Sequence, residues 1–276
     1  MKQTVDFFKN KVAIVTGGGS GIGAALSREL CSRGATVIVA DISVERAERT
    51  CVSVEGGGKM LPYRLDVTEG DSINKLLAET VEKWGFIHYM FNNAGILVAG
   101  EVRDMGFQHW REIVEVNILG VANGSVAAYL YMSGQGFGHI INIASLSGLI
   151  SSPLYAAYAM TKSAVIGLSK ALRSEGAALG IRVSVVCPGN VRTGIFEDST
   201  VVNADRESMF KPSVLKHIEP VEAARQILAG VIRNEAVIIF PFYARLMWWL
   251  DRVNSSLLNP LHAKVLQNSR TLRSKQ

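Results

Sequence analysis

Cysteine is scarce in this chain of 276 residues. The three cysteines, Cys31, Cys51 and Cys187, lie far apart and form no CxxC pair. An odd and sparse count fits a reducing compartment and argues against a disulfide framework. The five histidines are equally scattered, without the spacing of metal ligands, so no metal site is predicted.

Long apolar runs and dense charge clusters are also missing. The N-terminal stretch MKQTVDFFKN has no apolar core of a signal peptide, and no run of about 18 apolar residues predicts a membrane span. We therefore expect a cytoplasmic protein. The net charge of +5 is mild, and basic residues cluster only at Arg270–Lys275. Without a basic stripe, a zinc-finger spacing or an aromatic RNA-binding motif, nucleic acid is not an expected partner.

The chain is instead rich in short β-branched runs that alternate with longer helical patterns. Hydrophobic residues make up 48% and charged residues 19%, which is ordinary for a globular protein. Continuous apolar strands separated by helices predict a parallel sheet with helices on both faces, that is, a doubly wound α/β fold. We expect one domain over residues 1–240 and a helical extension over 241–276. The expected strands are 11–16, 36–41, 59–65, 87–92, 139–145, 181–189 and 236–240.

A glycine turn follows the first expected strand. The stretch TGGGSGIG (Thr16 to Gly23) opens a helix, whose N-terminal N–H groups suit a phosphate. No Lys-Ser/Thr pair follows the glycines, which disfavours a nucleoside-triphosphate loop. Asp41 ends the second strand, 18 residues after Gly23, where an acid binds adenosine ribose hydroxyls. Neither neighbour of Asp41 is basic, so the sequence predicts NAD rather than NADP.

A tyrosine and a lysine stand one helical turn apart in YAMTK (Tyr158 to Lys162). Of the seven tyrosines, only Tyr158 has a lysine four residues later. Residues at this spacing share one helix face. A nearby ammonium lowers the pKa of a phenol, typically by about 1–3 pH units, which would make Tyr158 a better base. Ser145 ends a strand 13 residues earlier, at the sheet edge where ligands bind.

Together these motifs resemble the short-chain dehydrogenase/reductase family, in its common subgroup of roughly 250-residue subunits. The match runs in order from about Lys11 to Phe240. The matching residues are TGGGSGIG at Thr16 to Gly23, Asp41, Asp66-Val67, NNAG at Asn92 to Gly95, Asn117, Ser145, YAMTK at Tyr158 to Lys162, and PGNVRT at Pro188 to Thr193.

The resemblance implies a Rossmann fold of about seven strands and a role for each matching residue. Tyr158 would be the general acid/base, Ser145 would hold the substrate oxygen, and Asn117 would support a water-mediated proton relay to Lys162. The implied contacts to NAD are Gly17, Ser20, Gly21, Ile22, Gly23, Asp41, Ile42, Asp66, Val67, Asn93, Ala94, Gly95, Tyr158, Lys162, Pro188, Gly189, Val191 and Thr193. The implied substrate contacts are Ser145, Leu146, Tyr155, Tyr158, Ile195 and Phe196.

The function expected from this resemblance is NAD-dependent interconversion of a secondary alcohol and a ketone. Two alternatives remain open: an idle NAD-binding regulator, and a lyase or epimerase on the same fold. Residues 190–219 would form a lid over the substrate. Its apolar residues Met209, Phe210 and Leu215, with Leu97 and Leu149 from other loops, suggest a lipid-like, steroid-like or aromatic substrate. No arginine or lysine stands out as an anchor for a carboxylate or phosphate, although Arg192 and Lys211 are candidates.

Two expectations concern partners. The helices over 107–132 and 153–179 have more apolar positions than one sheet face needs, for example Val121, Ala128, Leu168 and Leu172, which predicts a homodimer or homotetramer. Beyond Phe240, an apolar stripe recurs at helical spacing. It either packs on the body or on a neighbouring subunit, or rests on a membrane as a peripheral contact. The residues of the stripe are Phe242, Leu246, Trp249, Val253 and Leu257.

Overall fold

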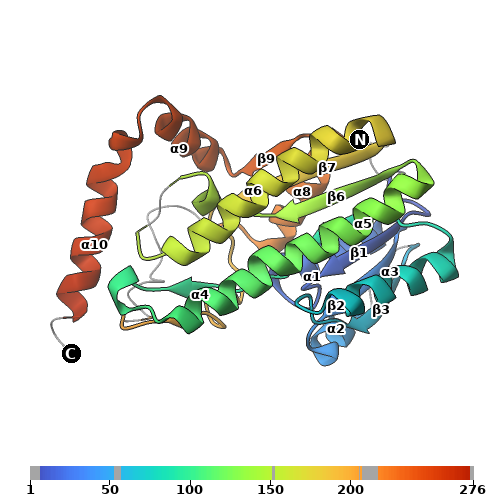
Figure 1. The fold of residues 1–276 in the computed structure, drawn as a ribbon, viewed down its shortest axis with the longest axis horizontal. Helices are drawn as coiled ribbons and strands as arrows, with labels where there is room; N and C mark the ends of the chain where they lie inside the picture. The colour runs from blue at the N-terminus through green and yellow to red at the C-terminus, as the bar shows by residue number, and fades with distance from the viewer. Residues whose placement is uncertain (1–6, 53–56, 151–152, 205, 207–216, 274–276) are drawn as a thin grey trace.

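The computed structural model describes residues 7–52, 57–150, 153–204, 206 and 217–273. Its centre is a seven-stranded parallel sheet in the order β3-β2-β1-β4-β6-β7-β9 (Figure 1). In this order the strands are β3 (Lys59–Arg64), β2 (Thr36–Asp41), β1 (Val12–Thr16), β4 (Tyr89–Asn92), β6 (Gly138–Ile143), β7 (Ile181–Pro188) and β9 (Val237–Phe240). The chain order reverses between β1 and β4, and a crevice forms at such a switch point.

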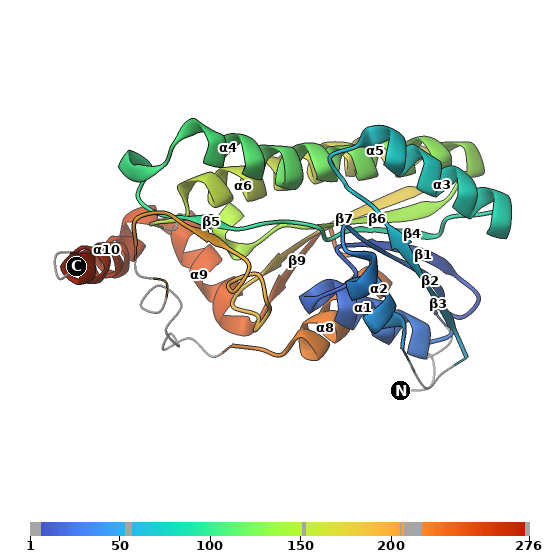
Figure 2. The same cartoon turned by 90° about the horizontal axis from the view of Figure 1, so that it is seen from below.

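Helices cover both faces of the sheet, as the alternating sequence pattern predicted (Figure 2). One face packs against α1 (Gly21–Ser32), α2 (Val44–Cys51) and α8 (Pro220–Ile232). The other packs against α3 (Gly70–Trp84), α5 (Val121–Gln135) and α6 (Ala156–Gly176). Each strand contributes side chains to both layers because successive residues point to opposite faces: Val15 lies in the first core and Ile14 in the second.

A long helical segment precedes β6. It consists of α4 (Phe107–Val114), a π-helical stretch η3 (Glu115–Gly120) and α5. By length and apolar composition, the segment Phe107–Gln135 passes as a candidate membrane span, which the sequence analysis did not expect. In the fold it lies against the sheet and α6, and 44% of its most apolar window is buried.

Smaller elements surround the strand ends. A two-stranded parallel sheet, which the sequence did not predict, pairs β5 (Val98–Ala99) with β8 (Thr200–Val201). It joins the loop after β4 to the segment after β7, so two distant parts of the chain meet above the site. The short helices are η2 (Val102–Asp104), η4 (Leu146–Gly148) and η5 (Ala177–Leu179).

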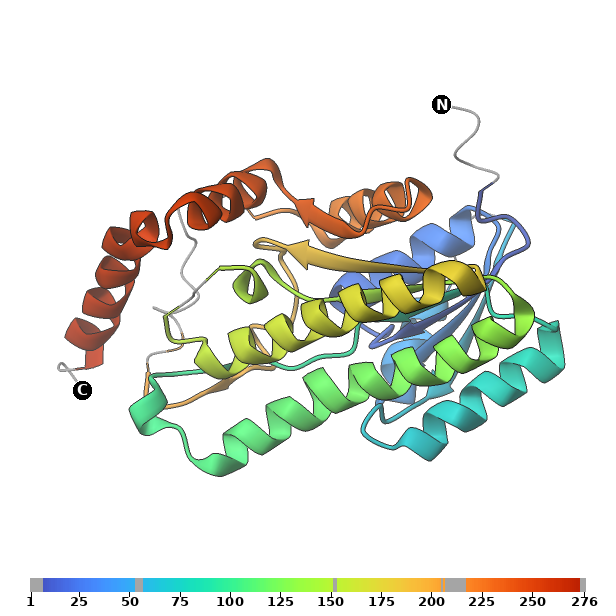
Figure 3. The same cartoon turned by 45° about the horizontal axis from the view of Figure 1, so that its top comes forward.

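The chain continues beyond the last strand as helices. These are α9 (Phe242–Val253), η6 (Ser255–Leu258) and α10 (Asn259–Arg273). Figures 1 and 3 show α10 projecting past the body, while α9 lies beside β9. Two ion-paired hydrogen bonds of 3.0 and 2.9 Å from Arg270 to Glu101 connect α10 to the loop after β5.

The fold explains two features of the sequence, a proline inside a strand and the surplus apolar positions on two helices. Pro62 lies within β3, which is tolerated because β3 is an edge strand with no further partner on its outer side. Val121, Ala128 and Leu172, offered as surplus apolar positions, are buried in the core of the single chain, and Leu168 packs against it. They therefore do not indicate an interface.

Candidate active site

A cavity of about 510 Å³ opens at the carboxyl ends of the parallel strands. It collects the motifs that the sequence analysis singled out from seven separate segments of the chain. The predicted site residues that line it are Gly17, Ser20, Gly21, Ile22, Asp41, Ile42, Asp66, Val67, Asn93, Ala94, Gly95, Ser145, Leu146, Tyr155, Tyr158, Lys162, Pro188, Gly189, Val191, Thr193, Ile195 and Phe196.

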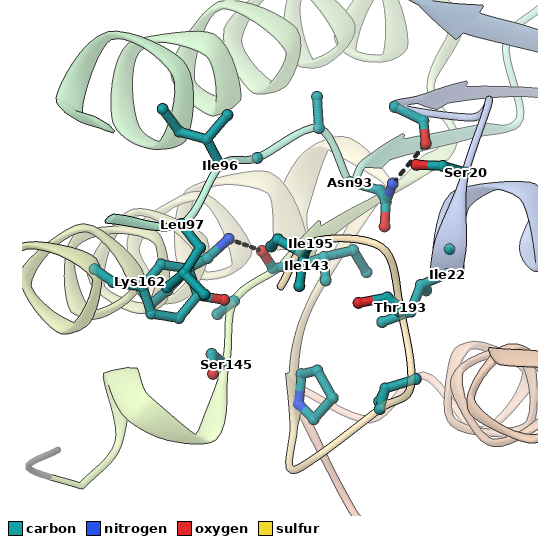
Figure 4. Close-up of a pocket in the computed structure, with 18 of the residues that line it drawn as sticks. Ser20, Ile22, Asn93, Ile96, Leu97, Ile143, Ser145, Lys162, Thr193 and Ile195 are labelled. Atoms are coloured by element: carbon teal, nitrogen blue, oxygen red, sulfur yellow. Dashed lines mark hydrogen bonds between the residues drawn. The ribbon is translucent and has the colours of Figure 1, made fainter. Parts of the chain in front are cut away.

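The glycine turn closes tightly against the turn after β4. Gly17 has φ +60°, and a Cβ there would stand 2.9 Å from the Cα of Ala94, so a side chain has neither the conformation nor the room. The Asn93 amide donates to the carbonyl oxygens of Thr16 and Gly17 at 3.0 and 3.1 Å. Figure 4 shows Asn93 held in this way beside Ser20. These contacts between the two turns leave the first turn of α1 facing the cavity.

Asp41 marks one end of the cavity. Its carboxylate accepts the N–H of Gly19 at 2.9 Å and the N–H of Ser43 at 3.1 Å. These bonds hold it, 7% exposed, at the end of β2. An immobile carboxylate here can accept hydrogen bonds from a vicinal diol such as a ribose.

A basic side chain also lies at the Asp41 end of the cavity, although neither sequence neighbour of Asp41 is basic. Arg46, in the first turn of α2, also lines the cavity, and its Nη1 donates to Asp198 at 3.0 Å. A Cβ at Gly19 would be 2.6 Å from the Cβ of Arg46 and 2.8 Å from Oδ2 of Asp41. The sequence argument that no base stands beside Asp41 was therefore incomplete: the helix that follows β2 supplies one.

Tyr158 and Ser145 meet at the other end. Tyr158 lies in the first turn of α6, and Ser145, predicted to end the strand, instead lies two residues past the end of β6 as the N-cap of η4. Their side chains are hydrogen-bonded. Burial raises the pKa of Tyr158 to about 12, although the bond to Ser145 works in the other direction. The sequence analysis expected a lowered pKa. Desolvation of the phenolate outweighs its neighbours in this structure, so the phenol is protonated near neutral pH.

Lys162 stands one turn further along α6. Its Nζ donates to the carbonyl oxygen of Ile143 at 3.0 Å (Figure 4) and lies 5.4 Å from the centre of the Tyr158 ring. Lys162 is 3% exposed, and this burial lowers the pKa of its ammonium to about 8. A Cβ at Gly95 would stand 3.4 Å from this Nζ, so a glycine at this position leaves the ammonium room.

Asn117 lies one layer behind the cavity wall rather than in it. It sits in the π-helical stretch η3, and its side chain is fully buried. The amide exchanges hydrogen bonds of 2.8 and 2.9 Å with the backbone of Ile96 and donates to Thr161 at 3.2 Å. In this arrangement Asn117 joins the loop after β4 to α6. π-Helical turns of this kind are frequent at functional sites.

Gly23 is the other predicted residue that does not line the cavity. A Cβ there would lie against the carbonyl of Gly17 and, at 2.5 Å, the amide nitrogen of Asn93. Gly23 thus allows α1 to approach the two turns closely and makes no contact of its own with a ligand.

The structure describes part of the predicted lid over residues 190–219. Ile195 and Phe196 line the cavity, as predicted, and so does Leu97. Leu149 packs instead against the core beneath η4. Arg192 faces Glu219 at 3.4 Å on the surface and is not among the lining residues. Met209, Phe210, Lys211 and Leu215 lie outside the described residues.

The sequence analysis missed two lining residues from the C-terminal extension. Tyr243 and Met247 of α9 reach into the cavity wall. The Tyr243 hydroxyl accepts the N–H of Asn190 at 2.7 Å, and a Cβ at Gly189 would lie 2.6 Å from it. Their spacing of four residues was available in the sequence, but an amphipathic helix after the last strand does not show which face meets the body.

The shape and donors of the cavity fit a dinucleotide. The exposed turn at Ser20 and Gly21 offers N–H groups for a pyrophosphate, and the Ser20 side chain makes no capping hydrogen bond that would occupy it. Asp41 lies at one end for a ribose, and Ser145 with Tyr158 at the other for a reacting group. No cluster of three or more metal-ligating side chains occurs within the part of the chain that the structure describes.

The fold and this site define a doubly wound nucleotide-binding oxidoreductase. The model of the short chain dehydrogenases matches residues 11–202, and the chain belongs to the short-chain dehydrogenase/reductase family. It is 32% identical over 255 residues to the oxidoreductase SadH of Mycobacterium tuberculosis, covering 90% of this chain and 92% of that one. It is 31% identical over 233 residues to a cyclohexanol dehydrogenase of an Acinetobacter species, covering 83% and 90%.

A solved structure extends the comparison to the whole fold. A short-chain dehydrogenase/reductase of Burkholderia phymatum, in complex with NAD, superposes with a TM-score of 0.79. That match has 26% sequence identity and covers 91% of this chain and 95% of the other.

Proposed function

We propose that this protein is an NAD-dependent oxidoreductase that interconverts a secondary alcohol and a ketone. The observation that supports it most directly is the meeting of Ser145, Tyr158 and Lys162 at one end of a cavity whose other end presents the buried carboxylate of Asp41. The dehydrogenases among its relatives and the NAD bound to the similar structure are in line with this assignment.

The residues around the reacting carbon would handle the proton and the orientation. The Ser145 hydroxyl would donate a hydrogen bond to the substrate oxygen and hold it beside Tyr158. Tyr158 would give its proton to that oxygen in reduction and recover it in oxidation. A bound nicotinamide would supply or accept the hydride. Lys162, whose ammonium is desolvated beside the ring, would stabilise negative charge on the phenol oxygen as its proton leaves.

The raised pKa of Tyr158 bears on the direction of proton transfer. A phenol that is protonated near neutral pH is ready to act as an acid, so the state described here suits carbonyl reduction. Oxidation needs the phenolate, which the charge of Lys162 must then favour.

The wall around Tyr158 suggests an apolar substrate. Apolar side chains in this wall come from the loop after β4, from η4, from the segment after β7 and from α9: Ile96, Leu97, Leu146, Ile195, Phe196 and Met247. Besides the proposed catalytic Lys162, the described lining includes the basic side chain of Arg46, which stands at the Asp41 end and is paired with Asp198. A lipid-like, steroid-like or aromatic alcohol would bury more of this surface than a small hydrophilic one.

The proposal is tested by following NADH absorbance with a panel of alcohols. Cyclohexanol, a steroid alcohol and an aromatic secondary alcohol should be oxidised, with glycerol as the hydrophilic control. Turnover of none of them, with NAD bound, would favour an idle binding protein. Conversion of a substrate with no net change in NADH would point to a lyase or epimerase. A strong preference for glycerol would refute the apolar substrate class alone.

We also propose that the protein is a homo-oligomer. The outer faces of α4, α5 and α6 leave large apolar side chains exposed, among them Phe107 at 85% and Leu130 at 66%. Val126 on α5, Met160 on α6 and Leu119 on the adjoining η3 are exposed as well. Pairing of this face with a second copy would remove them from water.

A further inference from the structure

The two C-terminal helices leave an apolar surface exposed. Phe242 is 79%, Trp249 60% and Val253 62% accessible to solvent. Each helix presents its own stripe at spacings of three or four residues: Phe242, Leu246, Trp249 and Val253 on α9, and Leu261 and Val265 on α10, with Leu257 between them. The expectation that this stripe packs on the body of the same chain is therefore wrong.

A different face of α9 makes the contact with the body. Ala244 is fully buried, and Tyr243, Met247 and Trp248 pack against the core cluster that includes Ile239 and Leu258. The stripe is thus a second apolar face, which the fold of a single chain does not cover. A soluble surface rarely keeps such a patch without a binding partner.

The charge of the chain is concentrated in the same segment. Six of the 29 lysines and arginines, but only one of the 24 acidic residues, lie in residues 241–276. The segment therefore has a net charge of +5, whereas residues 1–240 contain 23 charges of each sign and are neutral. The basic residues are Arg245, Arg252, Lys264, Arg270, Arg273 and Lys275. Arg252 lies over the Trp248 ring, 5.4 Å from its centre.

We propose that α9 and α10 form a docking surface for an anionic membrane. Their apolar stripe would enter the boundary between headgroups and acyl chains, and their basic side chains would meet lipid phosphates or carboxylates. Tryptophan suits that boundary because its ring is apolar and its N–H is polar. The helices are too short and too basic to span a bilayer, so the contact is peripheral.

The charge favours a membrane over a second copy of this chain. In a symmetric dimer the same patch faces itself, so two segments of +5 would be brought together. An anionic lipid surface attracts such a segment instead. Lys264 is exposed on α10 and, like Arg252, stands next to the stripe rather than on the neutral body.

The same helix also forms part of the cavity wall, through Tyr243 and Met247. Docking would therefore hold the substrate cavity beside the membrane, where an apolar substrate is concentrated. This consequence rests on the proposed function, but membrane docking itself does not. Vesicle binding needs neither cofactor nor turnover, so its failure is distinguishable from a failure of the enzyme assignment.

The test is co-sedimentation of the full chain with sucrose-loaded vesicles. Vesicles of phosphatidylcholine with phosphatidylglycerol are compared with phosphatidylcholine alone, at low and high salt. We expect preferential binding to the anionic vesicles that weakens with salt. Trp249→Glu should reduce binding about tenfold or more, since it removes a large exposed apolar side chain from the proposed membrane contact and adds a negative charge. Val221→Glu, at a 49% exposed apolar position on α8, is the matched control and should bind like the wild type.

A second pair of variants tests the charge. Lys264→Glu should weaken binding about fivefold or more at low salt. Lys75→Glu changes the net charge equally on the body, at a side chain that is 72% exposed, and should have little effect. Circular dichroism melting of every variant shows that it is folded, and Val253→Glu replaces Trp249→Glu if that variant unfolds.

Several results would overturn the proposal. One is absence of binding to anionic vesicles by the folded full chain. Another is equal, salt-independent binding to both vesicle types, and a third is binding that Trp249→Glu leaves unchanged. If Trp249→Glu instead lowers the oligomer mass in light scattering while vesicles bind nothing, a second copy covers the stripe.

Discussion

The Nζ of Lys162 lies 5.4 Å from the centre of the Tyr158 ring, and both residues line the same cavity from one face of α6. Burial acts on both groups in opposite directions: it raises the pKa of Tyr158 to about 12 and lowers that of Lys162 to about 8. Each group is thereby pushed toward its neutral form. This pairing allows the proposed function to be tested by substitution and by pH.

Removing the phenol oxygen tests the proton donor. Tyr158→Phe keeps the ring in place, so the cofactor should still bind, while kcat should fall at least about 10²-fold, as is typical of general acid–base groups. Steady-state kinetics and NAD binding by fluorescence measure the two effects. Tyr155→Phe is the control, because Tyr155 also lines the cavity but has no lysine on the next turn. More than about a tenth of the activity in Tyr158→Phe would contradict the role.

The buried ammonium of Lys162 makes a prediction about stability and pH. Its folded pKa, about 8, lies below its ordinary value of 10.5, so between these pH values the unfolded chain binds more protons than the folded one. Stability from this group therefore rises as the pH increases from 8 to 10.5, and the full cost of burying the charge is present below pH 8.

Lys162→Met should accordingly be inactive but more stable than the wild type near pH 7. The gain has an upper bound of about 3.5 kcal/mol, from a pKa about 2.5 pH units below its ordinary value at about 1.4 kcal/mol per pH unit, and loss of the hydrogen bond to Ile143 reduces it. Thermal melting across pH 7 to 10.5 should show the advantage shrinking as the pH rises. An advantage that stays constant with pH would show that the ammonium is not desolvated in the folded protein.

The position of Arg46 allows a more specific prediction about the preference for NAD over NADP. Asp41 should repel the 2′-phosphate of NADP, so NAD should be preferred in kcat/KM. Asp41→Ser should narrow that preference because Arg46 remains beside the site to pair with the phosphate. Adding Arg46→Ala to Asp41→Ser should remove the gain for NADP. If the wild type uses NADP as well as NAD, Asp41 is not the selecting residue.

Tyr243 offers a test of the C-terminal extension as part of the site. Tyr243→Phe removes the acceptor of the Asn190 N–H, next to the Pro188-Gly189 turn. A lost hydrogen bond of this kind is worth about 0.5–1.5 kcal/mol. We expect kcat/KM to fall about three- to tenfold, mainly through KM. Tyr131→Phe, on α5 and packed against the core, is the control. A fall confined to kcat would indicate a role in the chemistry rather than in positioning.

The oligomer is tested by light scattering. The wild type should exceed the monomer mass of 29.9 kDa at micromolar concentration. Leu130→Glu should lower that mass, because it places a charge in the proposed interface on α5. Val52→Glu, at the 67% exposed position that caps the C-terminus of α2, should not. A wild-type mass near that of the monomer would refute the proposal.

Much of the fold and the site could be predicted because the order of apolar strands, helices and turns along the chain determines them. Alternating apolar strands and helices dictate a parallel sheet, and strand ends such as Asp41 and Ser145 then meet at one edge by topology alone. The glycine turn is equally local, since Gly17 needs a left-handed conformation that few other residues adopt.

What the tertiary structure decided concerns packing between distant segments. Whether Arg46 faces Asp41, whether Tyr243 touches Asn190 and which face of α9 meets the body depend on how helices settle on the sheet. The pKa of Tyr158 is of the same kind: the sequence supplied its cation, but only the packed structure showed how much water is excluded from the phenol. Desolvation depends on the whole surroundings of a group and not on its neighbours in sequence, so it could not be derived from spacing alone.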